Sequence, residues 1–128
     1  MNTLLTCLLF ATILPYLVKI VTIFAIKKNL VYDNNHPRIQ QAQLQGFAAR
    51  TVAAQQNSYE ALVVFATAVL AAIATNHVSK TVECLAVLFI VIRLVYYVLY
   101  FANFASLRSL IWSLGLFCSL GILGSCFS

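Results

Sequence analysis

A run of polar residues at the start of a long apolar segment carries the groups best suited to chemistry. Arg50, Gln55, Asn57 and Glu60 precede residues 61–74, which are apolar except for one threonine. Charged and amide side chains are costly inside a bilayer and are usually kept there for a partner or a ligand. Asn57 and Glu60 are three positions apart, so on a helix both reach the same ligand. This segment is therefore the leading candidate for a binding site.

A second polar stripe is predicted further along the chain. Arg93, Tyr97 and Tyr100 share one side of a helix, with Tyr96 beside them. At ~1.5 Å per residue, Glu60 lies ~20 Å and Arg93 ~18 Å from the outer ends of their helices. This similar depth predicts a Glu60–Arg93 ion pair. Such a pair either belongs to a ligand site or only neutralises two charges and holds helices together.

The composition indicates what must position these residues. The chain has 128 residues, of which 62% are hydrophobic and 9% charged. Soluble domains average roughly 25% charged residues, so lipid must cover much of this apolar surface. We therefore expect one all-α membrane domain over residues 1–128. The net charge of +5 is spread along the chain, and no basic block with interleaved aromatics indicates nucleic-acid binding.

Four segments are long enough to cross a bilayer. About 20 apolar residues span roughly 30 Å of hydrocarbon, and residues 3–26, 47–75, 81–103 and 106–127 meet that length. Short turns connect the last three, so successive helices should be antiparallel neighbours. The expected architecture is an up-down, left-handed bundle of four transmembrane helices.

Basic residues predict the orientation of this bundle. They gather on one side of the predicted helices: Lys27, Lys28, Arg38 and Arg50 around the first loop, and Arg108 after the third span. The positive-inside rule therefore places loops one and three in the cytoplasm and both termini outside. The N-terminal segment lacks a basic start and a cleavage site, which favours a retained helix over a signal peptide. Short loops and missing targeting signals favour a bacterial inner membrane.

Other residues leave more than one interpretation. The four cysteines have no CxxC spacing or histidine partner, so we expect core residues rather than a metal site or disulfides. Lys19 lies within the first span, where it either extends to the cytoplasmic surface or joins the polar cluster. The last span has small residues that favour close helix contacts, including contacts between subunits: Gly115, Ser119, Gly121 and Ser125.

At these polar residues the chain resembles the MAPEG family, the membrane-associated proteins of eicosanoid and glutathione metabolism. In the second helix the matching residues are Arg50, Gln55, Asn57 and Glu60, in the third Arg93, Tyr97 and Tyr100, and after the third span Arg108 with Ser109. The resemblance covers most of the chain, including its four spans, long first loop and orientation. The most specific part is Asn57 followed three positions later by Glu60.

This resemblance implies a homotrimer with glutathione bound between subunits near the cytoplasmic side. Glutathione would be held by Arg50, Gln55, Asn57, Glu60, Arg93, Tyr97 and Tyr100. Arg108 would be the catalytic residue beside the sulfur, since a guanidinium favours the nucleophilic thiolate. A lipophilic electrophile would enter from the bilayer. Where catalytic members carry further basic residues, this chain has Ala53, Ala54 and Gln56.

Three functions compete at this point. The leading hypothesis is a glutathione-dependent transferase or peroxidase acting on a lipophilic electrophile. The second is a binding or scaffold protein of the same fold without catalysis. The third is a small four-span exporter in which Glu60 alternates between a proton and a substrate, although a cation such as Arg93 at the same depth would keep Glu60 ionised.

Overall fold

The computed structural model describes residues 1–28 and 30–128, and these fold into helices only. The helices are α1 (Asn2–Lys27), α2 (Pro37–Ala42), α3 (Gly46–Ala74), α4 (Lys80–Phe101) and α5 (Ala105–Ser125). All but α2 are long and apolar enough to cross a membrane, as expected of an integral multi-pass membrane protein. Their ends differ from those of the predicted spans by one or two residues.

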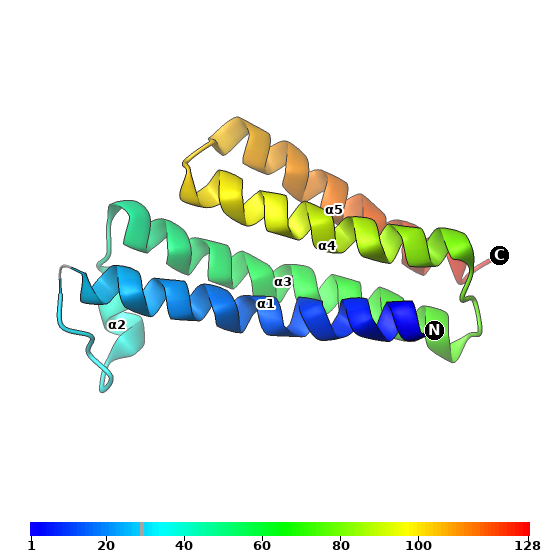
Figure 1. Cartoon of the computed structure of the whole chain (residues 1–128), viewed down its shortest axis with the longest axis horizontal. Coiled ribbons are helices and arrows are strands. Elements are labelled where there is room, and N and C mark those ends of the chain that lie inside the picture. The colour runs from blue at the N-terminus through cyan, green and yellow to red at the C-terminus, as the bar shows by residue number, and fades with distance from the viewer. Residues whose placement is uncertain (29) are drawn as a thin grey trace.

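The four long helices lie side by side. Helix α1 packs mainly on α3, α4 packs mainly on α5, and α3 also contacts α5. Both termini and the α3–α4 connection lie at one end of the molecule, and α2 and the α4–α5 connection lie at the other (Figure 1). Helices α3, α4 and α5 therefore bring their polar residues together near the end that carries α2.

Tight helix ends fix the connections at both ends of the bundle. Helices α3 and α4 are each followed by an asparagine with a left-handed backbone, Asn76 at φ 60° and Asn103 at φ 65°. After α4, the backbone N–H of Phe104 donates to the Leu99 carbonyl at 2.9 Å. Asparagine tolerates this conformation, which satisfies the last carbonyls of a helix. The short turn after α4 places Arg108 in the first turn of α5.

The first connection contains a helix that the hydropathy pattern does not predict. Helix α2 begins with Pro37, which is favoured at a first helical position because its fixed φ suits a helix. The Asp33 carboxylate accepts from the backbone N–H of His36 at 3.1 Å. The Gln40 amide donates to the Val31 carbonyl at 2.8 Å. These contacts give the polar loop a defined shape beside the bundle.

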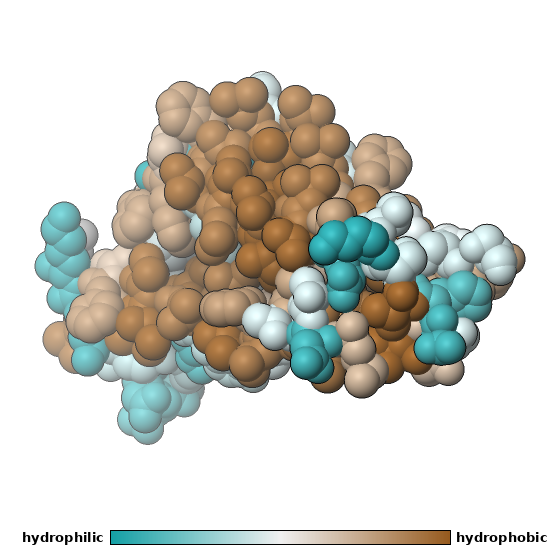
Figure 2. Space-filling view, turned by 45° about the vertical axis from the view of Figure 1, so that its right-hand side comes forward, coloured by the Kyte–Doolittle hydropathy of each residue, from teal (hydrophilic) through white to brown (hydrophobic). Residues whose placement is uncertain are grey.

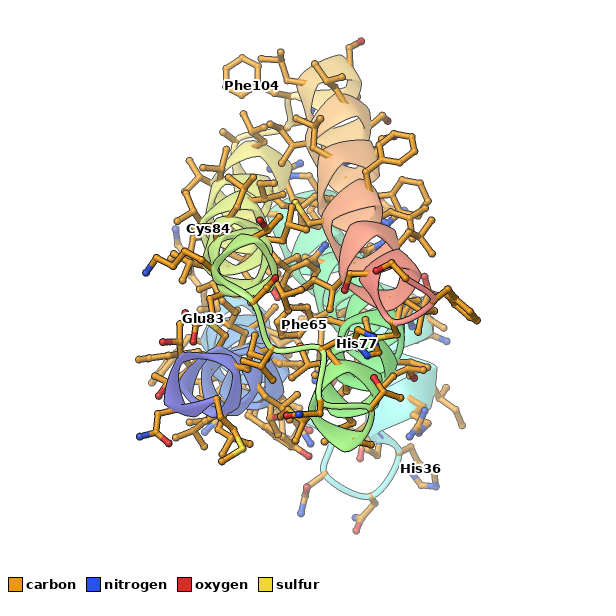
Figure 3. The ribbon with its side chains drawn as sticks, turned by 90° about the vertical axis from the view of Figure 1, so that its right-hand side faces the viewer. His36, Phe65, His77, Glu83, Cys84 and Phe104 are labelled. Atoms are coloured by element: carbon orange, nitrogen blue, oxygen red, sulfur yellow. The ribbon has the colours of Figure 1, made fainter. Side chains whose placement is uncertain are left out.

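The interior of the bundle is aromatic at its centre. Phe65 of α3 is fully buried and stacks on Phe89 of α4 with ring centroids 4.0 Å apart. Figure 3 shows Phe65 between the helices, whereas Phe104 points outward. Large apolar side chains remain exposed along the outer helix faces, and they cover the middle of the face in Figure 2. Such a surface suits contact with lipid.

Candidate functional site

A polar groove runs between α3, α4 and α5. Its volume is about 490 Å³. The residues that line it come from all three helices: Ala53, Gln56, Asn57 and Glu60 of α3, Tyr96 and Tyr100 of α4, and Arg108, Ser109, Trp112 and Ser113 of α5. We call it the α3–α5 groove. It brings together four of the predicted site residues: Asn57, Glu60, Tyr100 and Arg108.

Arg93 holds Asn57 from beneath this groove. The Arg93 side chain is 3% exposed, and its Nη1 donates to Asn57 Oδ1 at 2.9 Å. The guanidinium carbon also lies 4.2 Å from the centre of the Tyr96 ring. Charge-assisted hydrogen bonds and cation–π contacts both stabilise a desolvated guanidinium. Because its oxygen accepts from Arg93, Asn57 has its amide nitrogen available to donate into the groove.

The predicted ion pair between Glu60 and Arg93 is wrong. No salt bridge within 4.0 Å joins these two described side chains, and Asn57 is the hydrogen-bond partner of Arg93. Depth along two helices is the same for many pairs, but contact also requires that both side chains face each other. Glu60 is exposed and lines the groove, so its carboxylate remains accessible to a ligand.

Arg108 is the cation that lines the α3–α5 groove. Its guanidinium carbon lies 4.1 Å from the centre of the Tyr100 ring. Stacking on an aromatic face orients a guanidinium and leaves its N–H groups able to donate. Ser109 and Ser113, on the same helix, add hydroxyls to the groove. A groove with a carboxylate on α3 and a guanidinium on α5 suits a ligand that carries both charges.

Some predicted site residues do not line this groove: Arg50, Gln55, Arg93 and Tyr97. The Tyr97 hydroxyl is hydrogen-bonded to the buried hydroxyl of Ser58 on the α1 side of the bundle. Arg50 lies nearer the end of the bundle, where its Nη2 donates to the Phe101 carbonyl at 3.5 Å. Arg93 contacts two groove residues, Asn57 and Tyr96, but does not line the groove itself. The predicted stripe is therefore divided between two sides of α4.

A second polar groove lies on the other side of α3. Its volume is about 360 Å³. Its lining comes from α1, the first connection and α3: Lys19, Tyr32, Asn34, Pro37, Arg38, Gln41, Val52, Gln55, Gln56 and Tyr59. We call it the α1–α3 groove. Lys19 lies here rather than beside Arg93, and Gln55 faces here too. Gln56 lines both grooves, so one ridge of α3 separates them.

Several groove residues were not among the predicted site residues: Gln56, Tyr96, Trp112 and Ser113. A signal existed for Tyr96, because residues three positions apart share a helix face as closely as residues four apart. The sequence favoured Tyr97. In the structure the Arg93 guanidinium contacts both rings, but Tyr96 is the one that lines the groove. Nothing in the sequence distinguishes Gln56 from its neighbour Gln55.

Comparison with known proteins identifies the family of this chain. A family model described as the MAPEG family matches residues 3–128. Searches of curated proteins and of solved structures found no match. The family match covers essentially the whole chain, from the first turn of α1 to the last residue. The resemblance predicted from the polar residues of α3 and α4 is thus confirmed, and the chain belongs to the MAPEG family.

Proposed function

We propose that this protein is a membrane-embedded, glutathione-dependent transferase or peroxidase that acts on a lipophilic electrophile. Family members generally use glutathione. The observation that carries the proposal is that Glu60 of α3 and Arg108 of α5 line the same groove, together with Asn57. A groove that holds both charges, together with amides and hydroxyls, suits a zwitterionic peptide.

Glutathione matches these groups by its chemistry. It carries two carboxylates, one ammonium and one thiol. Glu60 accepts from the ammonium, and the amides and hydroxyls of the lining donate to the carboxylates. Sites for small molecules measure roughly 300–1,000 Å³, and the α3–α5 groove, at about 490 Å³, falls within that range.

Arg108 supplies the chemical step. Its guanidinium stabilises the thiolate form of glutathione, which is the nucleophile. In the transferase reaction the sulfur bonds to an electrophilic carbon as the leaving group departs with the electron pair of its bond. In the peroxidase reaction the thiolate attacks the terminal hydroperoxide oxygen and the O–O bond breaks, which yields a sulfenic acid and an alkoxide that takes a proton from water to become an alcohol. A second glutathione then forms a disulfide and releases water.

We further propose that the bundle is an up-down, left-handed domain that assembles as a homotrimer. Loops one and three then face the cytoplasm and both termini lie outside, in a bacterial inner membrane. Glutathione lies between subunits near the cytoplasmic face. In support of this arrangement, Gln56 lines both grooves, and the α1–α3 groove carries Lys19 and Arg38. These cations would face a neighbour's glutathione and offset the missing basic residues at Ala53 and Ala54.

The remaining predicted residues take supporting roles in this proposal. Arg93 keeps Asn57 in place through the 2.9 Å hydrogen bond. Tyr100 orients Arg108 through ring contact. Gln55 lies in the α1–α3 groove, so it would contact the glutathione of a neighbouring subunit. Arg50 lines neither groove, and its guanidinium donates to the Phe101 carbonyl at the end of α4.

Calorimetric titration of glutathione into the purified protein in detergent tests this function. We expect saturable binding, and Asn57→Ala should weaken it about tenfold, the effect of losing one charge-assisted hydrogen bond. Asn35→Ala is the matched control, because this exposed asparagine lies in the first connection outside both grooves. An intact oligomer that neither binds glutathione nor conjugates it to an aryl halide would support the scaffold alternative instead.

A further inference from the structure

The last turn of α4 has one carbonyl that a side chain of another helix satisfies. A helix leaves its last four carbonyls without partners inside the helix. After α4, N–H groups of the following turn donate to three of them, those of Val98, Leu99 and Tyr100. No backbone N–H in the described parts of the chain donates to the fourth, that of Phe101. Arg50 Nη2 donates to it from α3 at 3.5 Å.

An aromatic contact reinforces this junction between α3 and α4. The Phe47 ring of α3 meets the Phe101 ring of α4 edge-on, with ring centroids 5.7 Å apart. The guanidinium carbon of Arg50 lies 5.8 Å from the centre of the Phe47 ring. A cation is also favoured beside the carbonyls at the end of a helix. Phe47 and Arg50, three positions apart on one face of α3, therefore fasten the last turn of α4.

This turn of α4 carries part of the α3–α5 groove. Tyr100 directly precedes Phe101, and its ring lies 4.1 Å from the guanidinium carbon of Arg108. Only residues 102–104 connect α4 to α5, and Arg108 lies in the first turn of α5. A shift of the last turn of α4 would therefore move both Tyr100 and Arg108. Arg50 lines neither groove, so its influence on the α3–α5 groove passes through α4.

We propose that Arg50 is a positioning residue that holds the end of α4 on α3 and thereby keeps Tyr100 and Arg108 in place for the glutathione sulfur, an inference that rests on the proposed glutathione function. Direct binding of a glutathione carboxylate by Arg50 would require its guanidinium to leave the Phe101 carbonyl and enter a groove that it does not line. Arg50 thus acts on the chemistry through Arg108 and not through the ligand.

A double-mutant cycle on thiolate formation tests this role. Arg50→Ala should lower the thiol–thiolate equilibrium constant of bound glutathione about fivefold, the effect of losing one cation at the end of a helix. Ultraviolet absorbance of the thiolate measures it. In an Arg108→Ala background the same change should have no further effect, because Arg50 acts only through Arg108. Equal losses in both backgrounds would show an independent role and would overturn the inference.

A conservative variant and a control complete this assay. Arg50→Lys should retain most of the wild-type thiolate, because an ammonium still donates to the Phe101 carbonyl. Lys28→Ala is the matched control: this exposed lysine ends α1 at the same end of the bundle and lines neither groove. It should leave the thiolate unchanged. A loss as large as that of Arg50→Ala would indicate net charge as the cause and would contradict the positioning role.

A nuclear magnetic resonance measurement without glutathione separates the two proposals. The Nε–H resonance of Arg108 reports its contact with Tyr100, because an aromatic ring shifts nuclei held over its face. Arg50→Ala should move this resonance toward its position in Tyr100→Ala, while an unmoved Arg93 resonance shows that the bundle is still folded. An Arg108 resonance that stays in place overturns the inference alone. A shifted resonance in a protein that binds no glutathione overturns the proposed function, and with it the role of Arg50 in thiolate formation.

Discussion

Removal of the guanidinium by Arg108→Ala should lower the fraction of bound glutathione that is thiolate. Two unit charges about 4 Å apart interact by about 4 kcal/mol at an effective dielectric constant of about 20. Arg108 is half-buried in an open groove, so screening by water reduces this to about 2 kcal/mol. That energy corresponds to about 30-fold in the thiol–thiolate equilibrium and in kcat/KM at neutral pH.

Stopped-flow ultraviolet absorbance of the thiolate, recorded as glutathione is mixed with the protein, measures this effect. Arg108→Lys keeps the charge but loses the flat stack on Tyr100, so it should fall between the wild type and Arg108→Ala. Lys80→Ala removes a cation at the far end of the bundle and should change nothing. If Arg108→Ala binds glutathione and forms as much thiolate as the wild type, the role assigned to Arg108 is wrong.

Three further predictions concern the groove, the core and the ion pair at the N-terminus. Asn57→Ala leaves the Arg93 guanidinium without its 2.9 Å acceptor and should lower the free energy of unfolding by about 2–3 kcal/mol. Asn57→Asp keeps an acceptor oxygen and should retain the wild-type free energy of unfolding. Denaturant titration in detergent measures both variants. Phe65→Ala removes the fully buried ring stacked on Phe89 and should cost about 3–5 kcal/mol in the same assay, and a cost below about 1 kcal/mol would contradict this packing. Glu83→Gln breaks the ion pair with the largely exposed N-terminal ammonium and should lower the free energy of unfolding by less than about 1 kcal/mol. If the thermal stability of the wild type is the same at low and high salt, the pair contributes nothing.

The sequence predicted the long helices well because a bilayer imposes a simple rule on length and polarity. Each of the four membrane-length helices ends within two residues of its predicted end. Helix α2 was missed, because a short helix in a polar loop has no such requirement and is favoured only by Pro37 at its start. Hydropathy reports what faces lipid and says little about a connection outside it.

The polar residues were identified more reliably than their directions. Asn57, Glu60 and Arg108 line one groove, as the family pattern suggested. Tyr96 rather than Tyr97 lines the groove with them. The sequence did not distinguish the two, because a helix places the residues three and four positions from Arg93 on nearly the same face. Which of the two faces the groove depends on how α4 rotates against α3 and α5, and residue spacing along one helix does not give that rotation.

The same limit explains the absent Glu60–Arg93 ion pair and the two glutamines. Adjacent residues on a helix point about 100° apart, so Gln55 faces the α1–α3 groove while Gln56 reaches both. Depth along a helix follows from counting residues, but rotation about its axis follows from packing.

The position of bound glutathione is the most direct test of this account. Electron cryo-microscopy of the protein in lipid nanodiscs with glutathione should show ligand density in the α3–α5 groove, with its ammonium at Glu60 and its sulfur at Arg108. Density elsewhere in the molecule, or a groove that stays unchanged at saturating glutathione, would contradict the account.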